Sequence, residues 1–360
     1  MKLLVDCHVF DGKFQGTRTY IQGLYSSLVK FANIDFYFAA QDVENLKACF
    51  GEENANVHYI KLKCGGSIKR LAFEYPRLIK KYAIDYAHFQ YIGPFRKCCK
   101  EIITVHDVLF LDFPRYFPLF YRIKNFLLFR RSAKRADLLL TVSRYSKAAI
   151  SKHFSIDEKL IHVTPNAVLC DDFVCEKTDV CEKNGLDKFI LTVGRVEPRK
   201  NFLSLLRAYV ELSLHKEGYK LVFVGVPDLQ DKPFDLYYVS LPQVVKENVL
   251  FLKVPFAELV ELYKKTSLFV FPSYAEGFGI PPLEAIEYGA PMLCSKETAM
   301  AEFGFPPEML FSPYDMDELK HKMLSMLKNK LNMDVRDKIR ERFNWNKTAR
   351  QLYSVLEMLV

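Results

Sequence analysis

The sequence predicts an α/β protein of two doubly wound domains, each a parallel sheet with helices on both faces. Its 360 residues exceed the roughly 250 to 300 at which a single hydrophobic core stops growing. In the first half, short apolar runs alternate with helical patterns. In the second half, an apolar run, a loop and a helical pattern follow one another at residues 189–210 and again at residues 268–289. Such strand-loop-helix units predict parallel sheets.

Composition places the chain among globular proteins, because 50% of its residues are hydrophobic and 26% are charged. No run approaches the ~18 consecutive apolar residues of a transmembrane helix, and the apolar run at the start is too short for a signal peptide. We therefore expect a cytoplasmic protein. The nine cysteines form no CxxC pair and fit neither a disulfide framework nor a zinc site. No metal or other cofactor is expected.

Five apolar runs in the first half are typical of buried strands: residues 2–5, 36–39, 57–62, 102–105 and 138–142. After the first run, Gly16 precedes a helical pattern whose apolar residues recur at every fourth position. After the last run, Ser143 is predicted to cap a helix over residues 145–153.

A titratable side chain stands where the run 102–105 gives way to a loop. His106 directly follows this predicted strand, and histidine is the side chain most easily tuned near neutral pH. His106 is therefore a candidate catalytic residue. The alternative is a loop histidine that only hydrogen-bonds its neighbours.

Three cations crowd the start of a helix in the second half. Arg195, Arg199 and Lys200 follow the predicted strand 189–193, and Asn201 is predicted to cap the next helix. Like charges at the positive end of a helix dipole are unfavourable unless an anion lies among them, so the pattern predicts bound phosphate. A solvated basic loop is the alternative.

Two further apolar runs, residues 221–224 and 249–252, are predicted strands. Near the end of the second half, Asp315 and Asp317 spell a DxD, which binds a metal in other transferases. An amphipathic helical pattern follows directly, so we interpret the motif as a helix cap.

The stretch 267–294 carries the second strand-loop-helix unit of this half. Its apolar run, residues 268–271, is typical of a strand buried on both faces. Gly277 and Gly279 let the backbone approach a ligand, and the prolines at 281–282 favour the first turn of a helix. Such a junction points backbone N–H groups and a positive dipole end beyond the sheet, where anions and nucleotides bind.

Two carboxylates flank this loop. Glu276 lies in it, and Glu284 is predicted in the first helical turn, where the dipole favours the ionised form. An ionised Glu284 would have two oxygens free to accept hydrogen bonds from a diol. The alternative for Glu284 is a simple helix-terminus charge.

Residues 276–284, EGFGIPPLE, resemble the Glu-x7-Glu signature of glycosyltransferase family 4, whose members are retaining nucleotide-sugar glycosyltransferases of the GT-B fold. The resemblance implies two Rossmann-like domains that face a central cleft. It further implies that Glu276 contacts the transferred sugar, that the loop backbone holds sugar and diphosphate, and that Glu284 binds the nucleotide ribose.

Other family elements match elsewhere. Gly194-Arg195 and Arg199-Lys200-Asn201 resemble the elements that contact the diphosphate, which assigns this role to Arg195 and Lys200. Residues 104–107, TVHD, resemble a motif whose histidine lies against the sugar. The turn at Gly16 matches in part the family's Gly-x-Gly-Arg-Tyr, with Arg18 and Thr19 as departures.

The resemblance thus implies four catalytic residues: Glu276, His106, Arg195 and Lys200. The donor-binding residues that it implies are Gly16, Gly194, Arg195, Lys200, Glu276, Gly277, Phe278, Gly279, Ile280 and Glu284.

We therefore expect a retaining glycosyltransferase that moves a hexose, first of all mannose from GDP-mannose, to a hydroxyl acceptor in a lipid-linked or cell-surface polysaccharide precursor. The cations and the loop amides would stabilise the departing diphosphate without a metal. Two alternatives stay open: a nucleotide-sugar epimerase on the same fold, and a non-catalytic sugar-binding protein. A nucleic-acid partner is not expected, because no binding motif accompanies the net charge of +8.

We predict an acceptor-binding domain over residues 1–168 and a nucleotide-sugar-binding domain over residues 169–342. Residues 343–360 resemble the family's terminal helix, which crosses back to the first domain.

The positive charge lies in the first domain. Residues 1–168 carry 26 Lys and Arg against 15 Asp and Glu, whereas residues 169–360 carry 25 against 28. Residues 113–136 interleave basic side chains with seven aromatic ones, a mixture that suits an anionic membrane surface. We therefore expect peripheral attachment to the inner face of the cytoplasmic membrane. The alternative is that the aromatic residues face the core.

Overall fold

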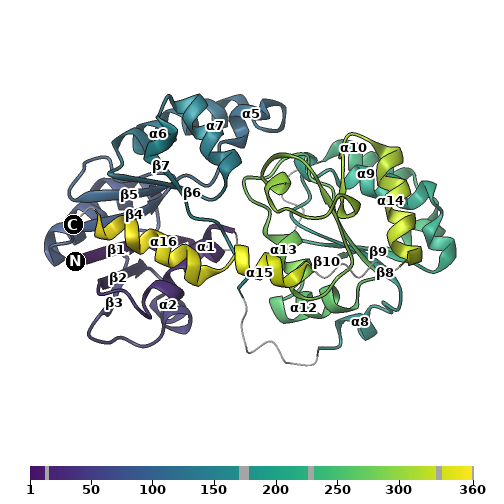
Figure 1. Ribbon diagram of the computed structural model, residues 1–360, viewed down its shortest axis with the longest axis horizontal. Coiled ribbons are helices and arrows are strands. Elements are labelled where there is room, and N and C mark those ends of the chain that lie inside the picture. The colour runs from purple at the N-terminus through teal and green to yellow at the C-terminus, as the bar shows by residue number, and fades with distance from the viewer. Residues whose placement is uncertain (13–15, 170–177, 226–230, 330–334, 359–360) are drawn as a thin grey trace. The chain divides into compact units, whose positions relative to one another are not determined.

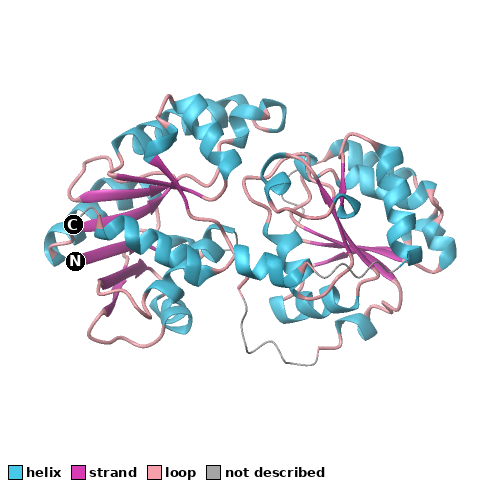
Figure 2. Ribbon diagram, viewed as in Figure 1, coloured by secondary structure: helices cyan, strands magenta, loops and turns pink. Residues whose placement is uncertain are grey.

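The computed structural model describes residues 1–12, 16–169, 178–225, 231–329 and 335–358. The chain forms two compact units (Figure 1): Met1–Leu169 together with Phe343–Val360, and Cys170–Arg342. These limits lie within one residue of the divisions predicted after residues 168 and 342. In each unit helices cover both faces of a central sheet (Figure 2).

The seven described strands of the first unit are all parallel. In spatial order they are β3 (Val57–Lys61), β2 (Asp35–Ala40), β1 (Lys2–Asp6), β4 (Tyr86–Gln90), β5 (Lys100–Thr104), β6 (Leu138–Thr141) and β7 (Ile161–Val163). The chain order reverses between β1 and β4. Doubly wound sheets bind ligands beyond the carboxyl ends of the strands at such a switch point.

The sequence did not predict β4 and β7. Every position of β4 is buried, but His88 and Gln90 interrupt its apolar pattern. β7 has only 3 residues, too few to show a period.

The helices of the first unit are α1 (Gly16–Leu28), α2 (Val43–Phe50), α3 (Ser67–Lys69), α4 (Tyr75–Tyr82), α5 (Leu109–Asp112), α6 (Leu119–Arg135), α7 (Arg144–Phe154) and α16 (Trp345–Glu357). A π-helical turn, η2 (Arg70–Glu74), joins α3 to α4 without a break. The short 3₁₀ segments are η1 (His8–Asp11), η3 (Pro114–Tyr116) and η4 (Glu158–Leu160). The predicted cap of α7 is confirmed, because the Ser146 N–H donates to Ser143 Oγ at 3.0 Å.

The last helix belongs to the first unit. α16 packs along α1 (Figure 1), and the Trp345 ring lies over Gly23, where a Cβ atom would come within 2.0 Å of it. The hydroxyl of Thr348 donates to the Pro165 carbonyl at 3.0 Å. Leu352 and Leu356 are buried beneath the helix.

The second unit repeats the strand order of the first, again with parallel neighbours. Its strands are β10 (Val249–Leu252), β9 (Lys220–Val224), β8 (Phe189–Val193), β11 (Leu268–Phe271), β12 (Met292–Ser295) and β13 (Leu310–Phe311). Here the chain order reverses between β8 and β11, so the two predicted ligand loops leave adjacent strands at the switch point.

The helices of the second unit are α8 (Val180–Lys183), α9 (Phe202–Glu211), α10 (Lys232–Ser240), α11 (Gln243–Lys246), α12 (Phe256–Lys265), α13 (Ile280–Glu287), α14 (Met316–Asn329) and α15 (Arg336–Arg342). The 3₁₀ segments are η5 (Pro198–Lys200), η6 (Leu214–Glu217), η7 (Thr298–Glu302) and η8 (Pro307–Met309).

Two predicted caps differ in outcome. Asp315 caps α14, because its Oδ1 accepts from the Glu318 N–H at 2.9 Å. The prediction for Asn201 was wrong: its side chain makes no capping bond, and Nδ2 donates instead to the carbonyls of Pro272 and Pro313 at 3.1 and 3.2 Å. Asn201 thereby links the loop after β8 to the loops after β11 and β13.

Candidate active site

An ion cluster lies at the switch point of the second unit. Glu276, in the loop after β11, accepts from Lys200 Nζ at 2.7 Å on Oε1 and from Arg199 at 2.9 Å on Oε2. Arg199 also pairs with Glu197 and donates to the Ala275 carbonyl. Each of these four charged side chains is 10–12% exposed. The cluster therefore holds two cations and two carboxylates almost out of water.

The cluster stabilises the ionised form of Glu276, whereas burial disfavours the charged form of Lys200. Burial would raise the pKa of Glu276, but the adjacent Arg199 and Lys200 outweigh it and lower this pKa to about 2. Burial lowers the pKa of Lys200, Arg199 adds to this effect, and Glu276 opposes it. Glu276 is thus ionised, and Lys200 has more to gain from an additional anion than an exposed lysine would.

The backbone of Glu276 is held by a strained residue. The Glu276 N–H donates to Thr298 Oγ1 at 2.9 Å, and Thr298 has a φ of 52°. A β-branched residue rarely adopts this conformation, which costs on the order of 1–3 kcal/mol. The fold thus tolerates strain where the Glu276 loop is positioned.

The glycine loop bends sharply into α13. Gly279 has a φ of 97° and precedes the first helical residue, Ile280. Phe278 is buried, and its ring packs against Phe303 with centroids 5.4 Å apart. The side chain of Phe278 therefore points into the core, so this residue can offer a ligand only its backbone. The first turn of a helix has N–H groups without intrahelical acceptors.

Glu284 lies deeper in the helix than predicted. It is the fifth residue of α13, beyond the first turn, and its Oε2 accepts from the Tyr263 hydroxyl at 2.9 Å. Burial raises its pKa to about 7, although the Tyr263 hydrogen bond opposes this. The prediction that the dipole governs Glu284 was wrong, because desolvation outweighs it. The carboxyl group is partly protonated near neutral pH.

Two glycines bring the loops after β8 and β9 together. Gly194 has a φ of 152° and Gly225 a φ of 150°. A Cβ atom on Gly225 would lie 2.0 Å from the Gly194 carbonyl oxygen, so a larger residue cannot fit there. The exposed Arg195 follows Gly194 directly. The close contact between Gly194 and Gly225 therefore fixes the position of the backbone at Arg195.

In the first unit, His106 lies beyond the end of β5. It is 7% exposed, Nε2 is 2.8 Å from Gln90 Oε1, and its ring meets the edge of Tyr20 with centroids 5.0 Å apart. Burial lowers the pKa of His106 to about 3. Since the Gln90 oxygen accepts, Nε2 carries the proton, and a neutral ring presents Nδ1 as an acceptor.

A buried hydrogen-bond network fixes this arrangement. Gln90 Nε2 lies 3.3 Å from Nε2 of His88, whose Nδ1 is 2.6 Å from the Tyr25 hydroxyl. Burial, with a smaller effect of His106, lowers the pKa of His88 to about 3. Burial therefore keeps both histidines neutral, and the network gives His106 one tautomer.

The remaining predicted site residue is Gly16, the exposed first residue of α1. A Cβ atom there would meet nothing within 4 Å, so the local space does not demand glycine. Arg18 donates to Asn45 Oδ1 at 2.9 Å and lies over the Phe10 ring. Residues 13–15 lie outside the described residues.

Sequence reasoning missed several residues of these sites. Arg199 was left without a role, although it belongs to the Arg-Lys-Asn element that signalled Lys200. Tyr263 and Thr298 carry no local signal, because each reaches the site from a distant segment. His88 and Gln90 were hidden in the unpredicted strand β4.

Comparisons with known families cover almost the whole chain. Residues 15–172 match the family described as Glycosyltransferase Family 4, and residues 176–350 match Glycosyl transferases group 1.

Among curated proteins, the chain is 30% identical to O-antigen chain mannosyltransferase B of Escherichia coli, over 68% of this chain and 67% of the relative. It is 34% identical to O-antigen chain mannosyltransferase RfbU of Salmonella typhimurium, over 54% of this chain and 52% of the relative. The matches thus span about two thirds and about half of these relatives.

Two solved structures share the fold. Sucrose-phosphate synthase from Thermosynechococcus elongatus superposes with a TM-score of 0.77 at 16% identity, covering 99% of this chain and 98% of that one. Anabaena HepE in complex with UDP and glucose gives a TM-score of 0.74 at 16% identity, covering 99% and 100%. The predicted fold class, GT-B with two Rossmann-like domains, is confirmed.

Proposed function

Because this chain belongs to glycosyltransferase family 4, we propose that it transfers mannose, with retention of configuration, from GDP-mannose to a hydroxyl group of a lipid-linked polysaccharide precursor. That the chain is a nucleotide-sugar glycosyltransferase follows from its family. The choice of mannose and of a polysaccharide precursor is supported by the names of the two mannosyltransferases above. In this proposal the second unit binds the donor and the first unit binds the acceptor.

The observation that carries the proposal is the buried cluster around Glu276. Departure of a nucleoside diphosphate develops negative charge, which fixed positive groups in a dry site stabilise strongly. Lys200 and the start of α13 supply such groups, and the exposed Arg195 adds a further positive charge, so the proposed reaction needs no metal. Glu276, held by Arg199, accepts from hydroxyl groups of the transferred sugar.

In the proposed reaction the bond between the sugar and the diphosphate breaks, and a bond to the acceptor oxygen forms on the same face. The acceptor proton passes to the departing phosphate. Glu284 accepts from the ribose hydroxyls, and the neutral His106 accepts from a sugar hydroxyl through Nδ1. Each of these residues therefore binds and orients rather than forming a covalent intermediate.

We also propose that the first unit binds the anionic surface of the cytoplasmic membrane. Four apolar side chains of α6 are 53–79% exposed: Leu119, Phe120, Ile123 and Leu127. Lys124 and Arg131 are exposed on the same helix. Basic side chains contribute about 1 kcal/mol each near an anionic leaflet, and apolar ones enter the headgroup boundary. Across the residues that the structure describes, none of the helices meets the length and apolarity required to cross a membrane.

The test begins with thermal shift against GDP, UDP and ADP, since a ligand of the folded state raises its stability. We expect GDP to raise the melting temperature most. Incubation with GDP-mannose alone should then release mannose slowly, and a lipid-linked oligosaccharide should accept it. A response to UDP alone would contradict the proposed donor, and a new nucleotide-sugar isomer without acceptor would indicate an epimerase.

A further inference from the structure

The carboxylate of Glu287 is buried at the unfavourable end of a helix. Glu287 is the last residue of α13, the helix that follows the glycine loop and carries Glu284, and it is 6% exposed. The C-terminal end of a helix carries a partial negative charge, which repels a carboxylate. A carboxylate that is buried at this end therefore needs cations from another element.

Two arginines of α15 supply these cations. Arg340 Nε donates to Glu287 Oε2 at 2.7 Å, and Arg340 Nη2 donates to Glu287 Oε1. Arg336 Nη2 donates to Glu287 Oε1 at 3.1 Å. The two arginines are four residues apart, so they project from one face of α15. Burial would raise the pKa of Glu287, but Arg340 and Arg336 outweigh it and lower this pKa. α15 thus holds an ionised Glu287.

A third arginine of α15 reaches the surroundings of the glycine loop. Arg342 Nη1 donates to the Phe303 carbonyl at 3.3 Å, and the Phe303 ring packs against Phe278 of the loop. Gly304 has a φ of 75°, and a Cβ atom on it would lie 3.2 Å from Arg342 Nη1. α15 is therefore connected to both ends of the loop-helix unit: to the loop through Phe303, and to the last residue of α13 directly.

α13 is held by two neighbouring helices. Both α12 and α15 pack against it (Figure 1). Tyr263 of α12 donates to Glu284 at 2.9 Å, whereas α15 binds Glu287, three residues farther along. α13 has 8 residues and is about 12 Å long, a length over which a helix is nearly straight. A displacement of Glu287 therefore also moves Glu284 and the N–H groups at the start of the helix.

We propose that Arg340 and Arg336 are positioning residues for the nucleotide. Acting through Glu287, they hold Glu284 where its carboxylate accepts from the ribose hydroxyls. A bidentate arginine pair restrains direction as well as distance, and misplacement of a binding group by about 1 Å is costly. In this proposal neither arginine contacts the nucleotide. The inference rests on the proposed function in taking Glu284 as the residue that binds the ribose.

The test compares GDP with 2′,3′-dideoxy-GDP, which lacks the ribose hydroxyls. Both affinities are measured by titration calorimetry of the full chain at pH 8, above the pKa of about 7 of Glu284. The unaltered protein should prefer GDP about tenfold or more, as expected for hydrogen bonds to a charged group. In Arg340→Gln this preference should fall to within about threefold. A merely structural role of Arg340 would weaken both nucleotides equally and leave the preference unchanged.

Further variants test the route through Glu287. Glu287→Gln should lower the preference as much as Arg340→Gln, and the double variant should lower it no further, because both changes break one contact. Arg340→Lys should restore part of it, since lysine keeps the charge but not the bidentate geometry. Arg336→Gln removes a single hydrogen bond and should act in the same direction more weakly. Lys338→Gln, which removes an exposed cation of the same helix, should change neither affinity.

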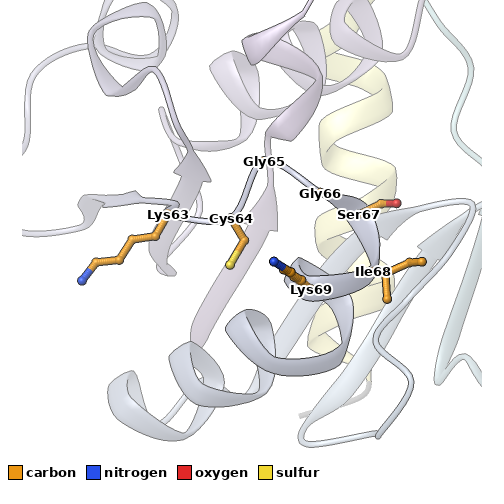
Figure 3. A pocket seen from close by; sticks show the side chains of 7 residues that line it. All are labelled: Lys63, Cys64, Gly65, Gly66, Ser67, Ile68 and Lys69. Carbon is orange, nitrogen blue, oxygen red and sulfur yellow. The ribbon is translucent and has the colours of Figure 1, made fainter.

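A cavity in the first unit provides a control for where the nucleotide binds. Its volume is about 510 Å³ and residues 63–69 line it, which is within the range of roughly 300–1,000 Å³ typical of small-molecule sites. Cys64 and Lys69 lie on the inner side of its Gly65-Gly66 turn, and Lys63 points away (Figure 3). Lys69→Gln should leave the GDP affinity unchanged. Loss of GDP binding in this variant would place the nucleotide in the first unit and overturn the proposal.

Two further results would overturn it: full preference for GDP in a folded Arg340→Gln variant, or equal affinity of the unaltered protein for both nucleotides. A cooperative melting transition of each variant verifies folding. If UDP binds and GDP does not, the proposed donor is wrong, and the same comparison with UDP and 2′,3′-dideoxy-UDP still tests the two arginines. Absence of binding of GDP, UDP and ADP alike would contradict the proposed function and, with it, this inference.

Discussion

Lys200 Nζ lies 2.7 Å from Glu276 Oε1, so the cation proposed to bind the donor diphosphate is paired with the carboxylate proposed to bind the sugar. Each residue satisfies the charge of the other while the site holds no donor. In the proposed reaction, Lys200 gains a second anion when the diphosphate binds and keeps its position. Removal of either residue should therefore affect binding and turnover differently.

The first prediction contrasts Lys200→Ala with Glu276→Ala. Lys200→Ala should weaken GDP binding and lower turnover together, because Lys200 is proposed to contact the diphosphate in both ground and transition states. Glu276→Ala should keep GDP binding and lower turnover. It should also reduce the free energy of unfolding by about 3–5 kcal/mol, because Arg199 and Lys200 lose their buried anion. Titration calorimetry measures GDP binding, and initial rates measure turnover. Unchanged turnover in both variants would contradict the assignment of Lys200 and Glu276 to the active site.

The second prediction concerns the pH dependence of stability. The pKa of Glu284 is raised to about 7 in the folded protein, from a reference of 4.5. Its contribution to stability is therefore complete below pH 4.5 and is lost as the pH rises through 7. Glu284→Gln should remove this loss, which is on the order of 3 kcal/mol. Urea unfolding at pH 4.5 and pH 8 tests this prediction. If the free energy of unfolding changes equally between these pH values in the unaltered protein and in Glu284→Gln, the prediction is wrong.

The third prediction isolates Tyr263. Its hydroxyl lowers the pKa of Glu284, so Tyr263→Phe should raise that pKa further. If ribose binding requires the ionised carboxylate, the pH at which GDP affinity reaches half its maximum should move upward. Tyr209→Phe is the matched control, because the Tyr209 hydroxyl donates to the Tyr219 carbonyl elsewhere in the unit. Calorimetric titration from pH 6 to 9 distinguishes the two, and identical profiles would count against the assignment.

The fourth prediction concerns α16. Gly23→Ala places a methyl group on the Trp345 ring and should destabilise the first unit by about 1–3 kcal/mol, as overpacking of a core does. Limited proteolysis should then cut near residue 343 sooner. Gly16→Ala is the control, because a Cβ atom there meets nothing within 4 Å. Equal melting temperatures for both variants would show that α16 does not depend on this contact.

The fifth prediction concerns the membrane surface. Phe120→Ser with Lys124→Glu should lower co-sedimentation with anionic vesicles several-fold, and added salt should do the same to the unaltered protein. Leu160→Ser, at an apolar residue 63% exposed on a different segment, should leave binding unchanged. Equal pelleting with neutral and anionic vesicles would contradict the proposal.

The loops of the proposed donor site could be predicted because the residues that shape each loop are close together in the sequence. Gly279 and the prolines after it determine how β11 passes into α13, and the cations before α9 lie within a few residues of one another. The same holds for Asp315, whose capping bond reaches only three residues ahead. Such short-range geometry depends on neighbours that a sequence displays directly.

The environment of each site residue could not be predicted. Burial of Glu284 depends on Tyr263, which α12 contributes, and the direction of its pKa shift follows from desolvation that no local pattern records. The strand β4 was missed because His88 and Gln90 satisfy their polar groups with Tyr25 and His106, partners distant in the sequence. Burial of a polar residue can be predicted only when its hydrogen-bond partner is known, because buried polar groups are hydrogen-bonded.

The return of α16 to the first unit makes the second unit an insertion within the first. During synthesis, Trp345 leaves the ribosome after every residue of the second unit. The contact between Gly23 and Trp345 can therefore form only when the chain is almost complete. The second unit is one continuous stretch of chain, residues 170–342. A separately expressed first unit needs a new peptide connection between Leu169 and Phe343, without which the helix that covers α1 is lost.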